Sequence, residues 1–284
     1  MMWVVLGQSG QLAQSLARRP DMADAQFLGR TQLDLASPEQ AAARLRELKP
    51  SVVINAAAWT AVDQAEKDLP QARFLNTHAP EAIARVCREL DIPFVHVSTD
   101  YVFSGAHGPA WKETDPIAPV NAYGQTKAEG EAAVSSIGGR VAIVRTSWVF
   151  SPFGNNFVKT MARLGRERDE VRVVADQVGR PTYAPDLAEA CVRMAGLLLE
   201  RPELAGIYHY ANSGHVSWAE VAQATFDELA RRGEKSARMV PITTADYPTP
   251  AKRPAWSTLD TSKIEALGIE TPDWRGRIGA CVKC

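Results

Sequence analysis

The sequence has no excess of charge of either sign. Its 284 residues include 32 lysines and arginines against 33 aspartates and glutamates, which gives a formal net charge of -1. A protein that binds nucleic acid by neutralising phosphates needs a basic excess, so we expect no nucleic-acid partner. The sequence also has no apolar run near the ~18 residues of a membrane-spanning helix. The opening run 1–6 is too short for a signal peptide and has no basic leader. We therefore expect a cytoplasmic protein with no membrane partner.

Cysteine is scarce, with four residues in the whole chain. Cys281 and Cys284 form a lone C-x-x-C at the last residues, and zinc would need two more ligands. We expect a reduced, frayed tail there, and neither a metal nor a redox site. Cys87 and Cys191 fall within apolar helical patterns, which predicts that they fill the core.

Short apolar runs alternate with helical patterns along most of the chain, which is typical of an α/β protein with a buried parallel sheet. Strands are predicted at 3–6, 26–28, 51–55, 94–98, 141–145 and 171–174, and a further short strand is predicted in the lobe at 207–210. The fold class is therefore a Rossmann-type doubly wound parallel sheet with a smaller α/β substrate-binding lobe. We assign 1–150 to a dinucleotide-binding domain, to which 171–205 returns, and we assign 151–170 and 206–284 to the lobe. No flexible linker separates the two.

A glycine turn follows the first strand. Gly7 and Gly10 are followed by Gln11 and Leu12, in the spacing G-x-x-G-x-x-A. Glycines at a strand-to-helix turn let a pyrophosphate approach the backbone and the free N–H groups of the helix. The spacing differs from G-x-G-x-x-G, so a tight turn without a ligand is the alternative.

Two further stretches bear on a cofactor. Arg30 follows the second strand, where a basic residue can hold the 2′-phosphate of NADP. This favours NADPH over NADH, although an exposed arginine with no such role is the alternative. The small residues 56–58 after the third strand would let a flat cofactor lie against the backbone, and an alanine-rich turn is the alternative.

Tyr123 and Lys127 are four residues apart in a predicted helix, 121–136, for which Asn121 is a suitable cap. At this spacing the two side chains share one face. A nearby ammonium lowers the pKa of a phenol, which would suit Tyr123 to protonate an oxygen as a general acid. Thr99 follows the strand 94–98, at the same edge of the sheet as the glycine turn, and its hydroxyl could hold a substrate carbonyl. A half-buried tyrosine with a solvated lysine is the alternative.

Other polar and aromatic residues have weaker signals. We interpret His96 as a core histidine and Asp63 as a residue that serves a helix dipole. Trp148, with Asn155 after it, would make a platform for a sugar or a base, and core packing is an equal alternative. Arg253 could pair with a diphosphate or be merely exposed.

These residues occur in runs that together resemble the dTDP-4-dehydrorhamnose reductase family, within the extended short-chain dehydrogenase/reductase group. Besides the glycine turn, the runs are Asn-Ala-Ala-Ala-Trp-Thr-Ala-Val-Asp at 55–63, Ser-Thr-Asp-Tyr-Val-Phe at 98–103, Tyr-Gly-Gln-Thr-Lys at 123–127, Arg-Thr-Ser-Trp-Val-Phe at 145–150, Asn-Asn-Phe at 155–157 and Arg-Pro at 253–254. The resemblance extends nearly end to end.

The resemblance implies reduction of the C4 ketone of dTDP-4-dehydro-L-rhamnose with NADPH or NADH, for cell-surface polysaccharide. Tyr123 becomes the proton donor, Lys127 its electrostatic partner and ribose holder, and Thr99 the hydroxyl that positions the ketone. The implied substrate contacts are Thr99, Asp100, Trp148, Asn155 and Arg253. Together with Arg30, the expected cofactor residues are Gly7, Gly10, Gln11, Leu12, Asp34, Leu35, Ala57, Ala58, Trp59, Thr60, Tyr123 and Lys127.

Some family members bind magnesium at a dimer interface through glutamates near the first helix and near the segment 181–190, which makes magnesium possible here. Ser15 and Pro185 stand at the comparable places here, so the expected magnesium ligands are not seen. A homodimer stays open as the assembly. Two other functions also stay open: a non-catalytic subunit like the methionine adenosyltransferase β subunit, and a sibling nucleotide-sugar reductase or epimerase.

Overall fold

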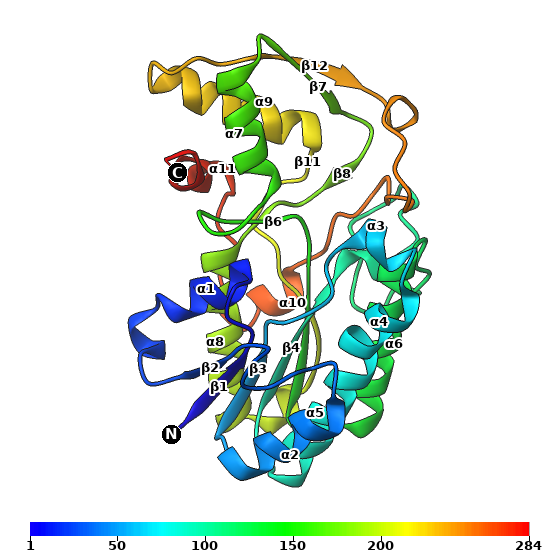
Figure 1. Cartoon of the computed structure of the whole chain (residues 1–284), viewed down its shortest axis with the longest axis vertical. Coiled ribbons are helices and arrows are strands. Elements are labelled where there is room, and N and C mark those ends of the chain that lie inside the picture. The colour runs from blue at the N-terminus through cyan, green and yellow to red at the C-terminus, as the bar shows by residue number, and fades with distance from the viewer. Residues whose placement is uncertain (284) are drawn as a thin grey trace.

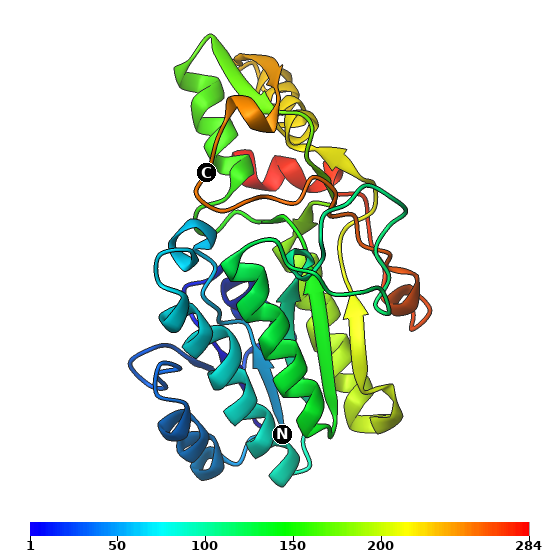
Figure 2. The same ribbon diagram turned by 90° about the vertical axis from the view of Figure 1, so that its right-hand side faces the viewer.

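The computed structural model describes residues 1–283 and contains a six-stranded parallel sheet (Figures 1 and 2). The strands are β1 Trp3–Leu6, β2 Gln26–Leu28, β3 Val52–Asn55, β4 Phe94–Thr99, β5 Val141–Thr146 and β10 Gly206–His209. Their order across the sheet is β10-β5-β4-β3-β1-β2. The order reverses between β1 and β3, which is the position where open α/β sheets bind ligands.

Helices cover both faces of this sheet, which confirms the doubly wound fold. One face carries α1 Gln11–Ala17 and α8 Ala184–Glu200. The other carries α2 Pro38–Leu48, α5 Ala79–Glu89 and α6 Ala122–Ile137. Strands between two helical layers must be apolar on both sides, and the four residues of β3 are all buried.

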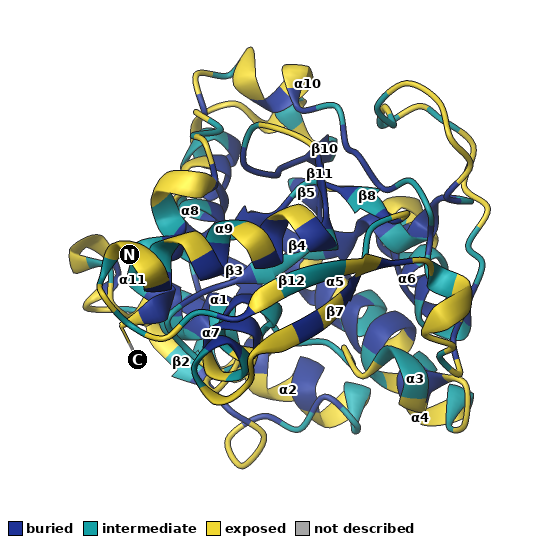
Figure 3. Ribbon diagram, turned by 90° about the horizontal axis from the view of Figure 1, so that it is seen from above, coloured by how far each residue is buried: buried dark blue, intermediate teal, exposed yellow. Residues whose placement is uncertain are grey.

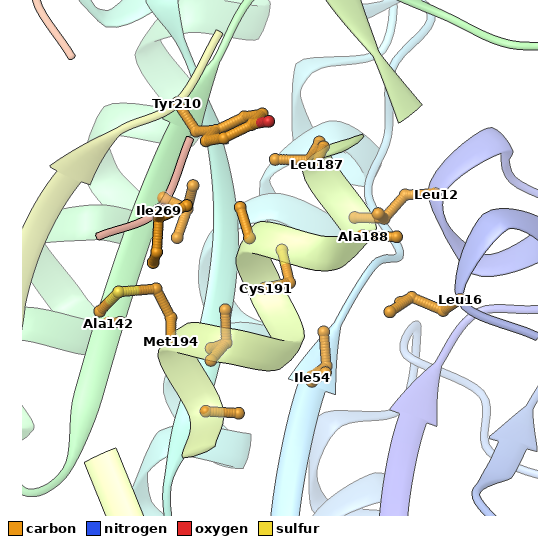
Figure 4. Packing of buried hydrophobic residues seen from close by; sticks show 14 of the residues in the cluster. Leu12, Leu16, Ile54, Ala142, Leu187, Ala188, Cys191, Met194, Tyr210 and Ile269 are labelled. Atoms are coloured by element: carbon orange, nitrogen blue, oxygen red, sulfur yellow. The ribbon is translucent and has the colours of Figure 1, made fainter. Parts of the chain in front are cut away.

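The core on the α8 face shows how the two layers pack. Leu187, Cys191 and Met194 of α8 belong to one buried cluster with Ile54 of β3 and Leu16 of α1. In Figure 4, Met194 lies beside Ala142 of β5, while Leu16 approaches from α1 on the opposite side. Burial of one such aliphatic side chain contributes roughly 1.5–3 kcal/mol. Cys191 is a core residue here, and Cys87 on the other face is one too, as expected.

A smaller lobe lies beyond the carboxyl ends of the sheet strands (Figure 1). It contains α7 Phe157–Glu167, α9 Trp218–Arg231 and α11 Arg275–Val282, with three strand pairs: β7 Glu170–Val174 with β12 Arg238–Ile242, β8 Val178–Gly179 with β11 Val216–Ser217, and β6 Val149–Phe150 with β9 Thr182–Tyr183. In Figure 3, α9 shows an exposed outer side and a buried inner side.

Short elements complete the chain. They are η1 Pro20–Met22, α3 Val62–Ala65, α4 Leu69–Arg73, the π-helix η2 Phe74–His78, η3 Asp100–Val102, η4 Pro202–Leu204, η5 Thr244–Asp246 and α10 Ser262–Glu265. None of the helices within residues 1–283 is both long enough and apolar enough to cross a membrane.

Three expectations need correction. The strand 171–174 does not join the central sheet, because β7 pairs with β12 in the lobe. The strand expected in the lobe after residue 206 is β10, which pairs with β5 and closes the central sheet. The tail is not frayed at Cys281, which is buried in α11; Cys284 lies outside the described residues. Isolated apolar runs carry no signal for the sheet they join. The assignment of the two parts to cofactor and substrate stays a prediction.

Candidate active site

The glycine turn lies at the carboxyl end of β1 and next to the end of β3. Gly7 has a φ of 115°, a region that glycine adopts without strain. A Cβ at Gly7 would lie 3.5 Å from backbone atoms of Ala56 and Ala57. Gly10 precedes α1 and gives this helix no side-chain cap. Gly7 is therefore required for its backbone conformation, and the start of α1 keeps N–H groups without a side-chain cap, which fit a dinucleotide phosphate.

The side chain of Gln11 makes hydrogen bonds to the lobe, whereas the side chain of Leu12 is part of the core. The Gln11 amide donates to the Val149 carbonyl (3.2 Å), and its oxygen accepts from Ser151 (2.8 Å) and Asn156 (3.0 Å). This side chain therefore joins the glycine turn to the beginning of the lobe. Leu12 is buried in the core, so its backbone is the part that can face a cofactor.

The residues after β2 are arranged around a weak ion pair. Arg30 is 85% exposed, and its Nε lies 3.8 Å from Asp34. The Asp34 carboxylate also accepts from the Ala36 backbone (3.0 Å), while Leu35 is buried. Arg30 is thus free to turn toward a phosphate, because so exposed an ion pair contributes little.

Asn76 holds the loop after β3 in place. Its amide oxygen accepts from the Trp59 backbone N–H (2.9 Å), and its Nδ2 donates to the Trp59 carbonyl (3.1 Å) and to Thr126 (3.0 Å). The loop 57–60, expected to line the cofactor, is therefore fixed against α6. Asn76 lies in the π-helix η2, and such bulges occur often at functional sites.

Thr99, Asp100 and Tyr123 meet at the end of β4. The Thr99 hydroxyl donates to Asp100 Oδ1 (2.9 Å) and accepts from the Tyr101 backbone (3.2 Å). It also faces the Tyr123 phenol and lowers its pKa. Asn121 caps α6 by accepting from Gly124 N (2.8 Å). The structure therefore brings these sequence-predicted groups together.

The pKa of Tyr123 is raised, whereas we expected it to be lowered. Burial raises it, the Thr99 hydroxyl opposes the rise, and the Asp100 charge adds to it. Lys127 is not among the causes of this shift, and its Nζ donates to the Val97 carbonyl (2.8 Å). The lowered pKa that we expected for Tyr123 is therefore wrong, and the role of Lys127 as its partner stays a prediction.

Lys127 is enclosed, with 1% of its surface exposed. Burial lowers its pKa to about 8, and Glu131 opposes this. His96 Nε2 lies 3.4 Å from the ammonium, and Asn55 Nδ2 lies 3.1 Å from the other ring nitrogen. Burial, with the Lys127 charge, holds the pKa of His96 well below its ordinary value. His96 is a core histidine, as predicted, and it contacts Lys127.

A buried ion pair supports α6 one turn beyond Lys127. Arg145 Nη2 and Glu131 Oε2 are 2.7 Å apart, and both side chains are almost fully buried. Arg145 also lies over the Phe103 ring and 3.3 Å from His209 Nε2. Loss of either partner would leave an uncompensated charge in the interior, so the pair fixes α6 against β5.

The aromatic and amide residues after β5 lie at the lobe boundary. Trp148 has a φ of 47° and stacks on Trp218 with ring centroids 3.6 Å apart. Asn155 is exposed and precedes Asn156, which caps α7. Trp148 thus belongs to an aromatic pair that joins the two parts of the chain, while Asn155 remains accessible.

Arg253 is paired rather than merely exposed. Its Nη2 donates to Asp63 Oδ2 (2.9 Å), and Asp63 Oδ1 accepts from the Ala251 backbone (3.1 Å). Our interpretation of Asp63 as a residue that serves the helix dipole missed this contact.

Sequence reasoning also missed Asn76, Trp218 and Glu131. Glu131 follows Lys127 at i+4, which was a signal for a shared face. Asn76 and Trp218 had no comparable signal, since each meets its partner through tertiary contacts.

No group of three or more His, Cys, Asp or Glu residues suited to a metal is found within residues 1–283. At the two places compared with the family's magnesium ligands, Ser15 donates to the Gln11 carbonyl (2.7 Å) and Pro185 lies in the first turn of α8. These residues do not fit a magnesium ion.

Comparisons with known proteins identify the family of this chain. The family model described as RmlD substrate binding domain matches residues 1–284. The dTDP-4-dehydrorhamnose reductase of Burkholderia thailandensis is 42% identical over 290 residues, covering 99% of this chain and 97% of that protein. The Escherichia coli K12 protein of the same name is 41% identical, covering 85% of this chain and 82% of its own length.

Solved structures show the same similarity. The dTDP-4-dehydrorhamnose reductase of Bacillus anthracis, in complex with NADP, has a TM-score of 0.88 and 34% identity, over 98% of this chain and 96% of that one. A Clostridium acetobutylicum protein of the same name has a TM-score of 0.91 and 33% identity, over 100% and 99% of the two chains. The chain therefore belongs to the dTDP-4-dehydrorhamnose reductase family.

Proposed function

We propose that this protein reduces the C4 ketone of dTDP-4-dehydro-L-rhamnose to give dTDP-L-rhamnose, with NADPH or NADH as the reductant. The observation that carries the proposal is the placement of Thr99, Tyr123 and Lys127 at the sheet edge that also bears the glycine turn. Family membership and the NADP complex of the Bacillus anthracis relative support the same reaction.

Tyr123 protonates the ketone oxygen as negative charge develops on it. Burial keeps its phenol protonated at neutral pH, so the proton is present when it is needed. Thr99 directs the carbonyl by its hydroxyl, and Lys127 holds the ribose beneath the phenol. Proton donation of this kind contributes a factor of about 10²–10⁴ in rate.

The glycine turn, the loop 57–60 and the segment 30–35 would hold the dinucleotide. A bound nicotinamide cofactor supplies the hydride. Arg30 favours the 2′-phosphate of NADPH, and Lys127 would contact the ribose next to the nicotinamide. Asp100, Trp148, Asn155 and Arg253 contact the nucleotide sugar in this proposal, with Arg253 at the diphosphate.

The test is the loss of NADPH absorbance with dTDP-4-dehydro-L-rhamnose, compared with GDP- and UDP-linked ketosugars. Turnover with the dTDP-linked ketone alone supports the proposal. Turnover only with another ketosugar assigns the protein to a sibling reductase or epimerase. Nucleotide binding without turnover of any ketone would instead indicate a regulatory subunit.

Two features of the setting belong to the same proposal. We place the enzyme in the cytoplasm, where the pyridine nucleotides are found, and we keep the homodimer as its assembly. Fractionation of the producing cells tests the first, and light scattering of the purified protein tests the second.

A further inference from the structure

The geometry points to Asp63 as a positioning residue for the substrate diphosphate: it holds the segment 251–253 over the start of α6 and fixes the Arg253 guanidinium there. This inference rests on the proposed function, because the diphosphate belongs to the nucleotide sugar. It concerns a contact between residues 190 positions apart in the sequence.

The contact has two parts, one to a side chain and one to the backbone. Asp63 Oδ2 accepts from Arg253 Nη2 (2.9 Å), and Oδ1 accepts from the Ala251 N–H (3.1 Å). A carboxylate that uses both oxygens in this way fixes the segment and the guanidinium in one orientation. An amide at position 63 has one acceptor oxygen in place of two, so it cannot accept at both positions that the carboxylate oxygens occupy.

The same segment is also tied to the catalytic helix. Asn121, the cap of α6, donates from Nδ2 to the Lys252 carbonyl (2.8 Å). The cap therefore connects the segment 251–253 to the turn that carries Tyr123. Ala251 is buried, so this part of the Pro-rich stretch is seated in the protein.

The ion pair lies beside the tyrosines of the site. Tyr101 and Tyr123 pack edge to face, with ring centroids 5.6 Å apart. Burial raises the pKa of Tyr101, the Arg253 charge lowers it and the Asp63 charge raises it. Both charges thus act on a phenol that contacts the proposed acid.

Arg253 keeps donors for a ligand while it is held. Of its five N–H groups, Nη2 uses one on Asp63 and Nη1 uses one on the Ala251 carbonyl (3.3 Å). Its side chain is 19% exposed, against 40% for Asp63. An arginine held in this way loses less rotamer freedom when a diphosphate binds, which increases affinity without a new contact.

The experiment measures dTDP binding by calorimetry with NADP⁺ at saturation, alongside steady-state kinetics. Asp63→Ala should raise the Kd for dTDP and the KM for the nucleotide sugar by about 10-fold, with kcat changed much less. The KM for NADPH should not change. For Asp63→Asn, the Kd for dTDP and the KM for the nucleotide sugar should lie between those of the wild type and of Asp63→Ala. This variant serves as the test if the alanine variant does not fold.

A double-mutant cycle separates positioning from general destabilisation. If Asp63 acts through Arg253, Asp63→Ala should add little to the effect of Arg253→Ala on dTDP affinity. Glu89→Ala is the control, because Glu89 on α5 also pairs with an arginine, Arg46 (2.7 Å), and its carboxylate is 51% exposed, against 40% for Asp63. This control should leave dTDP affinity unchanged.

Two results would overturn the inference: an unchanged Kd for dTDP in both Asp63 variants, or effects of Asp63 and Arg253 that simply add. Failure of the proposed function gives a different result, because the wild-type protein would then show no turnover of dTDP-4-dehydro-L-rhamnose, whatever its affinity for dTDP.

Discussion

The Thr99 hydroxyl donates a 2.9 Å hydrogen bond to Asp100, a carboxyl group with 2% of its surface exposed. The other oxygen, Oδ2, is buried and has no hydrogen-bond partner of normal geometry within residues 1–283. Burial raises the pKa of Asp100 from its ordinary 3.8 to about 7, and the Thr99 hydroxyl opposes the rise. The protein therefore holds, directly after the carboxyl end of β4, a carboxyl group that is protonated in mildly acidic solution.

The raised pKa of Asp100 predicts a pH-dependent stability. The folded protein keeps a proton on Asp100 between pH 3.8 and about 7, whereas the unfolded chain releases it. The stabilisation is full below the unfolded pKa and is lost as pH rises through the folded one, a difference of roughly 4 kcal/mol. In Asp100→Asn this contribution is absent. We expect the free energy of unfolding in urea to fall between about pH 4.5 and about pH 8, and to fall less in the variant than in the wild-type protein. An equal fall in unfolding free energy in both proteins would contradict a raised pKa for Asp100.

Replacement of Tyr123 by phenylalanine tests whether its hydroxyl is the general acid. Tyr123→Phe should reduce kcat by about 10²–10⁴ because no other group then protonates the ketone oxygen. The affinity for NADPH, measured by fluorescence titration, should be largely kept. Tyr101→Phe is the comparison, since the two rings are in contact. If Tyr101→Phe loses turnover and Tyr123→Phe does not, the acid is the other phenol.

The sequence predicted the helices and strands well, but it predicted contacts between distant parts of the chain poorly. Apolar runs located the five strands β1 to β5, and the i, i+4 spacing placed Tyr123 and Lys127 on one helix. These are local signals, because strand burial and helix periodicity repeat within a few residues.

Partners from distant parts of the chain carried no such signal. The pair Asp63–Arg253 and the pairing of β10 with β5 both depend on how the chain folds back. The sequence also could not predict the direction in which the pKa of Tyr123 is shifted, because this depends on burial and on the Thr99 and Asp100 side chains.

The close approach of α6 to the π-helix predicts a strict requirement for glycine. A Cβ at Gly130 would overlap the Asn76 carbonyl oxygen, which is backbone and cannot rotate away. Gly130→Ala should cost roughly 1–3 kcal/mol in unfolding free energy. It should also raise the KM for NADPH, because Asn76 holds the Trp59 backbone.

Gly196 provides the control for this change. It lies within α8, and a Cβ at this position would have no neighbouring atom within 4 Å, so an alanine there meets open space. Gly196→Ala should stabilise the protein by about 0.5–1 kcal/mol, through helix propensity alone. Equal effects of the two substitutions in urea unfolding would show that α6 can move away from η2 at no cost.

Coenzyme preference should depend on Arg30. The side chain is 85% exposed and only loosely paired with Asp34, so it can reorient toward a 2′-phosphate at little cost. Arg30→Ala should raise the KM for NADPH by about 10-fold or more, the loss of one charge-assisted contact, and leave the KM for NADH unchanged. Arg44→Ala, which removes an exposed arginine paired with Glu47 on α2, should change neither. Steady-state kinetics with both coenzymes decide the matter: an equal rise for NADPH and NADH would mean that Arg30 does not read the phosphate.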